Sequence, residues 1–204
     1  MKKGFFITFE GGEGSGKSTQ IAKTVDFLRA KGLKVLVLRE PGGTQAGEAI
    51  RNVLLDKNLK GMTQETELLL YLAARAQIVR EKILPALKQK KIVICDRFED
   101  STLAYQCFGR GISLEKVKSI SRLIVRENLN PNLTFLLDIA PEIGMKRGGR
   151  FDRMEKESML FHRKVRKGFQ SLAKSEPKRF CVIDSSEAKE KVFEKIKERL
   201  NRVF

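Results

Sequence analysis

The chain has 204 residues, 41 % of them hydrophobic, which is enough to build one compact domain with its own core. Lysine and arginine number 41 against 25 aspartate and glutamate residues, so the formal net charge is +16. No apolar run approaches the roughly 20 residues that cross a bilayer, and we expect no signal peptide. The three widely spaced cysteines, Cys95, Cys107 and Cys181, argue against a disulfide framework or a zinc site and favour a cytoplasmic location.

The positive charge leaves three kinds of partner open: nucleic acid, an anionic membrane surface or a phosphorylated small molecule. Its distribution is uneven. Residues 146–179 carry 12 Lys or Arg and 4 Asp or Glu, so half of the net charge, +8, falls in 34 residues.

Five short apolar runs rich in β-branched residues predict strands that are buried on both faces. They are Phe5–Phe9, Val35–Leu38, Ile92–Cys95, Leu133–Leu137 and Phe180–Ile183. Helical patterns occupy the intervals and the C-terminus, at Gln20–Ala30, Thr66–Lys90, Leu114–Glu127, Arg153–Ala173 and Ala188–Val203. This alternation predicts an α/β fold with a parallel sheet and helices on both faces. With no repeat or linker in the sequence, we expect a single domain over residues 1–204.

The first strand runs into a glycine-rich loop that matches G-x-x-x-x-G-K-[ST] in full. Backbone N–H groups of such a loop form a cradle for phosphate at a helix N-terminus. We therefore expect ATP to be bound by Gly11, Gly12, Glu13, Gly14, Ser15, Gly16, Lys17, Ser18 and Thr19. Lys17 is expected to reach the β- and γ-phosphates, and the Ser18 hydroxyl to ligate Mg²⁺. The loop does not identify the phosphate acceptor. The sequence lacks the N-K-x-D motif expected of a GTPase, which argues against that class.

Polar residues follow the second and third strands as well, at the sheet edge where ligands of open parallel sheets bind. Arg39 opens a Gly-rich loop after the second strand, and Asp96 and Arg97 follow the third. If the third strand neighbours the first, Asp96 lies beside Ser18 and can hold Mg²⁺ through water; alternatively, it orients Arg97. The planar guanidinium of Arg97 can hold two phosphate oxygens and so direct an in-line attack.

An ordered set of motifs resembles the thymidylate kinase family over nearly the whole chain. The set comprises Phe9-Glu10-Gly11 with the glycine loop, Arg39-Glu40-Pro41-Gly42-Gly43-Thr44, Ala73-Ala74-Arg75, Asp96-Arg97-Phe98, Ser101–Gln106, Pro131–Thr134 and Arg147–Glu155. The resemblance implies the strand order 2-3-1-4-5, a mobile lid at about residues 144–156 and a homodimer. It also implies Mg²⁺-dependent transfer of the γ-phosphoryl group of ATP to dTMP, with small nucleotides and neither nucleic acid nor membrane as partners.

Residues for dTMP follow from the resemblance together with residue chemistry. The acceptor phosphate is assigned to Arg97, Arg51 and Arg39. For Arg39, the alternative is that it holds its loop in place. Without the resemblance, Arg51 would be interpreted as a solvated helix residue. Glu13 is assigned to the sugar 3′-hydroxyl; the alternative is a side chain facing solvent. The base is assigned to Tyr71, Arg75, Thr102 and Gln106, and Tyr105 to the 2′ position. Tyr71 and Tyr105 also fit as ordinary core aromatics.

The lid prediction rests on Arg147, Arg150 and Arg153, which lie in the basic region around a Gly-Gly pair. An arginine brought in by lid closure can stabilise charge on the transferring phosphoryl group. Gly14 stands where one branch of the family has an arginine, so the resemblance implies that the lid supplies the catalytic arginine. We favour Arg153 for this role, with Arg147 and Arg150 as accessories. We expect adenine contacts near residues 184–186.

Two rival functions remain open at this point: a P-loop kinase for another small molecule, and a DNA-binding P-loop ATPase suggested by the charge. The single histidine, His162, falls in a Lys/Arg-rich helical pattern, and we expect it at the surface rather than in catalysis.

Overall fold

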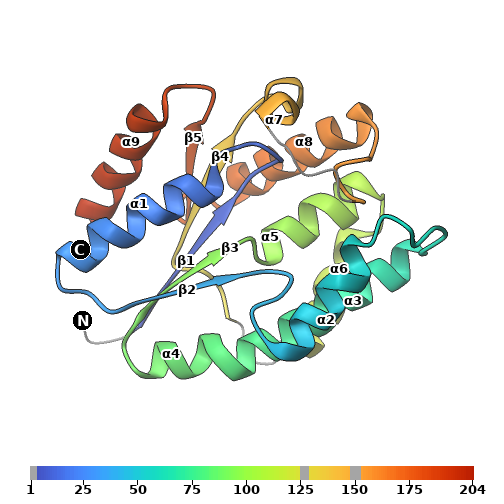
Figure 1. Ribbon diagram of the computed structural model, residues 1–204, viewed down its shortest axis with the longest axis horizontal. Helices are drawn as coiled ribbons and strands as arrows, with labels where there is room; N and C mark the ends of the chain where they lie inside the picture. The colour runs from blue at the N-terminus through green and yellow to red at the C-terminus, as the bar shows by residue number, and fades with distance from the viewer. Residues whose placement is uncertain (1–3, 125–128, 148–152) are drawn as a thin grey trace.

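The computed structural model describes residues 4–124, 129–147 and 153–204 (Figure 1). Its centre is a sheet of five strands, all parallel, in the order β2-β3-β1-β4-β5. The strands are β1 (Phe5–Glu10), β2 (Val35–Arg39), β3 (Ile92–Asp96), β4 (Leu133–Asp138) and β5 (Phe180–Asp184). The predicted class, strand positions and strand order are confirmed.

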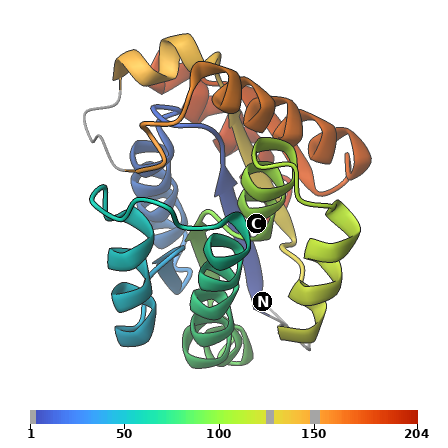
Figure 2. The ribbon, with the colours of Figure 1, turned by 90° about the vertical axis from the view of Figure 1, so that its right-hand side faces the viewer.

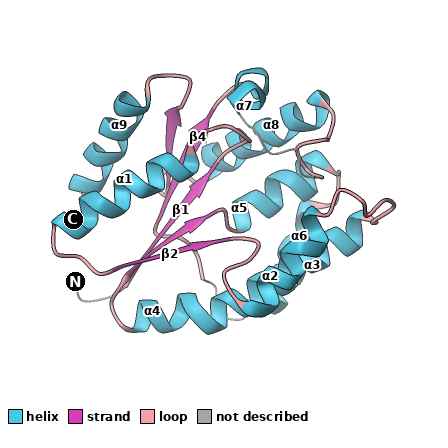
Figure 3. Cartoon of the chain, viewed as in Figure 1, coloured by secondary structure: helices cyan, strands magenta, loops and turns pink. Residues whose placement is uncertain are grey.

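Helices cover both faces of this sheet, as predicted (Figure 3). On one face, α1 (Lys17–Ala30) and α9 (Lys189–Asn201) pack on Ile7 and Phe9 of β1. On the other face lie α3 (Gln64–Ile78), α6 (Leu114–Ile124) and α8 (Met159–Ser175). Since side chains alternate along a strand, the apolar run of β1 supplies both cores at once, Phe6 pointing away from Ile7 and Phe9.

The long helical pattern predicted at Thr66–Lys90 is one rod with a wider turn inside it. It comprises α3, the π-helical turn η1 (Val79–Ile83) and α4 (Leu84–Lys88). The Thr63 side chain begins the rod by accepting a hydrogen bond from the Thr66 backbone N–H. The predicted helical segment is therefore confirmed, whereas the sequence pattern did not predict the π-helical turn within it.

Further helices lie between the strands, outside the helical patterns above, and the first of them is the helix expected to carry Arg51. They are α2 (Gln45–Leu55), α5 (Glu99–Thr102), η2 (Leu103–Gly109) and α7 (Pro141–Arg147). The predicted start of the fourth helix at Arg153 is wrong, because Ser158 accepts a hydrogen bond from the Phe161 backbone N–H and begins α8 at Met159.

The expected surface position of His162 is also wrong, since the residue is only 5 % exposed. His162, Val165 and Phe169 are spaced three and four residues apart, so they share the face of α8 that packs inward. Of the cysteines, Cys95 is buried and Cys181 is partly buried. Within the described ranges, no helix combines the length and apolarity that a membrane crossing demands.

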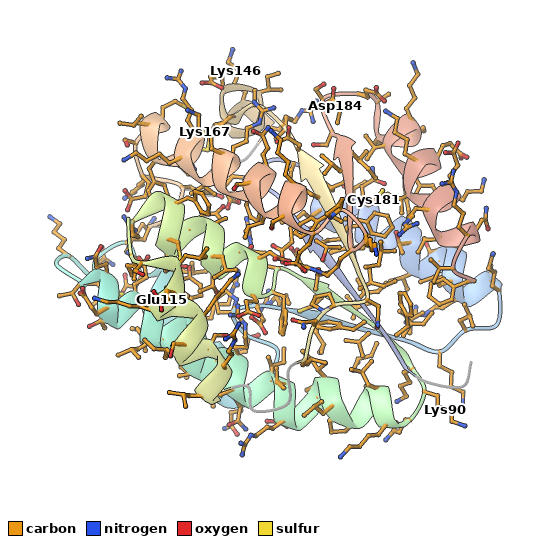
Figure 4. The ribbon with its side chains drawn as sticks, turned by 180° about the vertical axis from the view of Figure 1, so that it is seen from behind. Lys90, Glu115, Lys146, Lys167, Cys181 and Asp184 are labelled. Carbon is orange, nitrogen blue, oxygen red and sulfur yellow. The ribbon has the colours of Figure 1, made fainter. Side chains whose placement is uncertain are left out.

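The carboxyl ends of the strands lie at one edge of the molecule. Asp184, the last residue of β5, is at the same edge as Lys146 of α7, far from Lys90 just before β3 (Figure 4). Lys146 and Lys167, on α7 and α8, are exposed and point outward there. A side view places α7 and α8 over the end of the sheet where β1 leads into α1 (Figure 2). Part of the basic surplus therefore flanks the edge where the predicted site residues gather.

Candidate active site

The glycine loop connects the buried end of β1 to the N-terminus of α1, as its motif predicts. Gly14 adopts a φ of 65° and lies against α7, where a Cβ would collide with the backbone of Gly144. A larger residue at this position therefore cannot fit without moving α7. The contact explains in physical terms why this chain has glycine rather than arginine there.

Lys17 folds back over the loop that precedes it. Its Nζ donates to the carbonyl oxygens of Gly11 at 3.2 Å and Gly12 at 3.1 Å, and to Ser15 Oγ at 3.4 Å. Burial lowers the pKa of Lys17, as does the charge of Arg97, while Glu13 and other carboxylates partly offset this. The ammonium group is thus held inside the loop that would receive phosphates.

Arg97 lies directly across from this loop, in a left-handed conformation with a φ of 69°. Its Nη1 donates to the carbonyl of Gly11 at 2.9 Å, and its Nη2 pairs with Glu13 Oε1 at 2.6 Å. The Tyr105 hydroxyl donates to the same Glu13 oxygen at 3.0 Å. Burial raises the pKa of Glu13, but Arg97 and Lys17 outweigh it and bring the pKa to about 2. Glu13 therefore faces Arg97 and Tyr105 and not open solvent.

Glu10 fixes the turn that carries Arg97. Its carboxylate accepts hydrogen bonds from the Phe98 backbone N–H at 2.8 Å and from Ser101 Oγ at 2.6 Å. Burial and the charge of Asp100 raise the pKa of Glu10 to about 8. Glu10 belongs to the Phe9-Glu10-Gly11 motif, and its contacts give it the role of supporting an arginine in an unfavourable backbone conformation.

The structure tests whether Ser18 and Asp96 fit a magnesium ion. β3 does neighbour β1, and both residues line one open cavity of about 660 Å³. Asp96 Oδ1 is buried and has no hydrogen-bond partner in the described part of the chain. A hydroxyl and a carboxylate are hard oxygen ligands, so the two side chains fit Mg²⁺.

A second cavity, of about 120 Å³, opens beside Arg97. All the residues predicted for the acceptor line it except Arg39, namely Glu13, Arg51, Tyr71, Arg75, Arg97, Thr102, Tyr105 and Gln106. They come from α2, α3, α5, η2 and the loops after β1 and β3. Tyr71 and Tyr105 thus belong to the cavity wall, whatever part they also take in packing.

Arg75 is buried at the end of this cavity, with 2 % of its surface exposed. Its Nε donates to Glu40 Oε2 at 2.8 Å, and its Nη2 donates to Thr102 Oγ1 at 2.8 Å. Among the described residues, neither Arg75 Nη1 nor Glu40 Oε1 has a hydrogen-bond partner. Buried polar atoms are rarely left unpaired, so these two atoms are candidates for contact with a ligand.

Of the two remaining arginines predicted for the acceptor phosphate, Arg51 lines the cavity of about 120 Å³ and Arg39 does not. Arg39 lies outside the cavity and pairs with Glu48 at 2.8 Å, while Glu48 also accepts from the Gly43 N–H at 2.7 Å. This arrangement supports the alternative in which Arg39 holds its loop in place. Arg51 donates to the Pro41 carbonyl at 2.9 Å and does line the cavity.

The predicted lid arginines are not gathered at one point. Arg147 donates to the carbonyls of Ser185 at 2.8 Å and Ser186 at 3.0 Å, beside a cavity of about 370 Å³ that Gly16 also lines. Arg153 is on the other side, where its Nε donates to the Leu54 carbonyl at 2.9 Å and its Nη2 pairs with Glu67 at 2.6 Å. Arg150 lies outside the described residues.

Glu40 and Glu67 are absent from the predicted site, although both are buried carboxylates that touch predicted base-binding residues. A signal for Glu67 exists, because Glu67, Tyr71 and Arg75 recur every fourth residue and so share one face of α3. Glu40 stands in the quoted Arg39–Thr44 motif after the second strand, but nothing in the motif gives it a role, because its partner is 35 residues away in the chain.

A phosphate-binding loop on a parallel sheet, facing a basic cavity across one shared arginine, is the arrangement of a P-loop kinase that acts on a small phosphorylated molecule. A family model described as thymidylate kinase matches residues 9–196. The chain belongs to the thymidylate kinase family, and its relatives indicate a nucleoside monophosphate kinase, a phosphotransferase.

Individual relatives agree over almost the full length. The chain is 48 % identical to "Thymidylate kinase" of Protochlamydia amoebophila, covering 97 % of this chain and 92 % of that one. It is 49 % identical to "Thymidylate kinase" of Thermoanaerobacter sp., covering 95 % and 96 %. The crystal structure of thymidylate kinase from Ehrlichia chaffeensis superposes with a TM-score of 0.79 at 36 % identity, covering 97 % of this chain and 98 % of that one.

Proposed function

We propose that the chain transfers the γ-phosphoryl group of ATP to dTMP, giving dTDP and ADP. The observation that carries this proposal is the position of Arg97, which touches the glycine loop through the Gly11 carbonyl and also lines the acceptor cavity. A single guanidinium between the two sites can neutralise the repulsion of two anionic nucleotides and hold the acceptor phosphate for in-line attack.

The donor is placed on the side of α1. Backbone N–H groups of the loop and the N-terminus of α1 bind the phosphates, and Lys17 exchanges its carbonyl partners for phosphate oxygens. Adenine is assigned to the cavity of about 370 Å³ near Ser185 and Ser186, where the sequence analysis also expects it.

The acceptor is placed in the cavity of about 120 Å³. Its phosphate lies toward Arg97 and Arg51, its 3′-hydroxyl toward Glu13, and its base toward Arg75 and Gln106. A phosphate monoester carries close to two negative charges at neutral pH and is already a nucleophile, so the reaction needs no general base.

Ser18 and Asp96 are the residues that would hold Mg²⁺, because Asp96 Oδ1 has no hydrogen-bond partner among the described residues. The ion supplies neutralisation of charge on the β- and γ-phosphate oxygens. The protein's own part at this position is to present two hard oxygen ligands at the carboxyl end of β3 and the start of α1.

The lid assignment to residues 144–156 is part of the same proposal, with Arg153 favoured as the arginine that stabilises the transferring group and Arg147 and Arg150 as accessories. Homodimer formation and a cytoplasmic location also remain proposals. The dimer rests on the family resemblance, and exposed Leu69 of α3 and Leu123 of α6 offer apolar surface for it.

The test is a coupled assay of ADP release with a panel of nucleoside monophosphates as acceptors. We expect a clear preference for dTMP, and a requirement for both ATP and Mg²⁺. Equal or better turnover of another monophosphate would overturn the acceptor assignment, and ATP hydrolysis that only DNA stimulates would overturn the reaction itself.

A further inference from the structure

Glu67 is a buried carboxylate that has no place in the proposed phosphoryl transfer. It lies on α3 with 1 % of its surface exposed, and three side chains converge on it. Arg110 donates to it from Nε at 3.0 Å and Nη2 at 3.1 Å, and Arg153 pairs with it at 2.6 Å. The third partner is the amide of Gln106, whose Nε2 donates to Glu67 Oε1 at 2.9 Å.

The charge state of Glu67 decides how Gln106 is oriented. Burial raises the pKa of Glu67, but the hydrogen bonds and charges of Arg110 and Arg153 outweigh it, so the pKa lies below the ordinary value. Glu67 is therefore ionised at neutral pH. An ionised carboxylate only accepts hydrogen bonds, so it holds the NH₂ end of the Gln106 amide and repels the carbonyl end.

This orientation matters because Gln106 also lines the acceptor cavity, as does Arg75 with its unpartnered Nη1. An amide is planar, so fixing Nε2 on the side of Glu67 fixes Oε1 on the other side. The order in which Gln106 offers a donor and an acceptor is thereby set before any base arrives.

Pyrimidines differ in the order of these groups along the same edge. Thymine and uracil present an N3–H donor and an O4 acceptor, whereas cytosine presents an N3 acceptor and an N4 donor. One orientation of an amide pairs with the first pattern, and the flipped orientation pairs with the second.

We propose that Glu67 is a positioning residue for base selectivity, which holds the Gln106 amide in the orientation that accepts thymine or uracil and rejects cytosine. This inference rests on the proposed function, because it assumes that the base lies against Gln106. It assigns to Glu67 a role distinct from tying α3 to Arg110 and Arg153, which is a role in packing only.

The sharpest test is Glu67→Gln, because a glutamine at position 67 can accept from or donate to Gln106 and so satisfies both orientations of its amide. We expect the ratio of kcat/KM for dTMP to kcat/KM for dCMP to fall about tenfold, since one of the mismatches that reject cytosine is removed. Glu157→Gln is the matched control: Glu157 pairs with Arg110 at 2.7 Å and is not a partner of Gln106, so the ratio should not change.

Two further variants separate positioning from packing. In a Gln106→Ala background, Glu67→Gln should leave the ratio unchanged, because the amide that it releases is gone. Glu67→Asp retracts the carboxylate from Gln106 while keeping a negative charge for the two arginines. It should lower the ratio as Glu67→Gln does, so it serves as the test if Glu67→Gln fails to fold.

These measurements distinguish failure of the proposed function from failure of the positioning role. A wild-type protein that does not prefer dTMP refutes the proposed function. A wild-type protein that prefers dTMP, together with Glu67 variants that keep the wild-type ratio or an equal loss in Glu157→Gln, overturns the positioning role alone.

Discussion

The two ends of the proposed active site, a phosphate end and a base end, are built by different means. At the phosphate end, one continuous segment from Gly11 to Ser18 forms the binding loop, and its groups are mostly backbone amides and the Lys17 ammonium. At the base end, buried side chains from separate elements form the cavity: Glu40 follows β2, Arg75 and Glu67 lie on α3, and Gln106 lies on η2.

The difference follows from what each end has to recognise. A phosphate has the same shape and charge in every nucleotide, so a cradle of N–H groups suffices. A base is recognised by the order of its donors and acceptors, so side chains must be held in one orientation, and buried ion pairs hold them here. Four predictions, from the largest expected effect to the smallest, test this contrast.

The first prediction concerns the buried pair at the base end. Glu40→Ala leaves the Arg75 guanidinium buried without its carboxylate, so we expect the free energy of unfolding to fall by about 3–5 kcal/mol, as measured by urea denaturation. Arg163→Ala removes the exposed partner of Glu142 and should cost only about 0–1 kcal/mol. Equal losses in the two variants would contradict the view that the base end depends on buried charge pairs.

The second prediction concerns the phosphate end, where function rather than stability should suffer. Lys17→Ala removes a positive charge from the transferring phosphoryl group, and we expect kcat to fall by about 10²–10³ with little change in melting temperature. Lys23→Ala, farther along the same helix, is the control and should keep wild-type turnover. A Lys17 variant with nearly normal kcat would contradict the proposal that the glycine loop binds the phosphates of the donor.

The third prediction concerns Glu10, which links the two ends through the turn that carries Arg97. Its pKa in the folded protein, about 8, lies above the ordinary 4.5, so the folded state keeps the proton between these values and the unfolded state does not. Stability should therefore decrease as pH rises from about 5 to 8, by at most about 1.4 kcal/mol per pH unit from this group.

Glu10→Gln mimics the protonated carboxyl: its amide oxygen can accept from the Phe98 N–H, and its NH₂, like a carboxyl O–H, can donate to Ser101 Oγ. Denaturation curves at pH 5, 6.5 and 8 should show a flatter pH dependence for the variant than for the wild type. An unchanged slope would mean that Glu10 is ionised in the folded protein and that other groups cause the dependence.

The fourth prediction concerns Arg153, which in this structure lies at the base end, on Glu67. If it turns to the transferring phosphoryl group on lid closure, Arg153→Ala should lower kcat by about tenfold and change the KM for dTMP less. A pure rise in KM would place Arg153 with the base-binding network and pass the catalytic role to another arginine.

The parts of the site that a local pattern encodes were predictable. The glycine loop is such a pattern, and so is the polar residue after each buried strand, which is how Asp96 and Arg97 were located. Tyr71 and Arg75 lie four residues apart in the helical pattern predicted at Thr66–Lys90, which is the spacing of one helix face, and both line the cavity.

Other features depend on partners that are distant in the chain, and sequence patterns missed them. His162 lies in a basic run, yet the packing face of α8 buries it. Glu67 meets Gln106 39 residues later in the chain, and no local spacing encodes that contact.

The sequence by itself determined the sheet, the phosphate loop and the family, because buried strands and a nucleotide cradle need particular residues at short, regular intervals. Only the tertiary structure decided which carboxylate faces which arginine and how the Gln106 amide is held. Those choices depend on the packing of α3 and α8 against η2, which brings residues from separate elements within hydrogen-bonding distance and removes the water that would otherwise satisfy them.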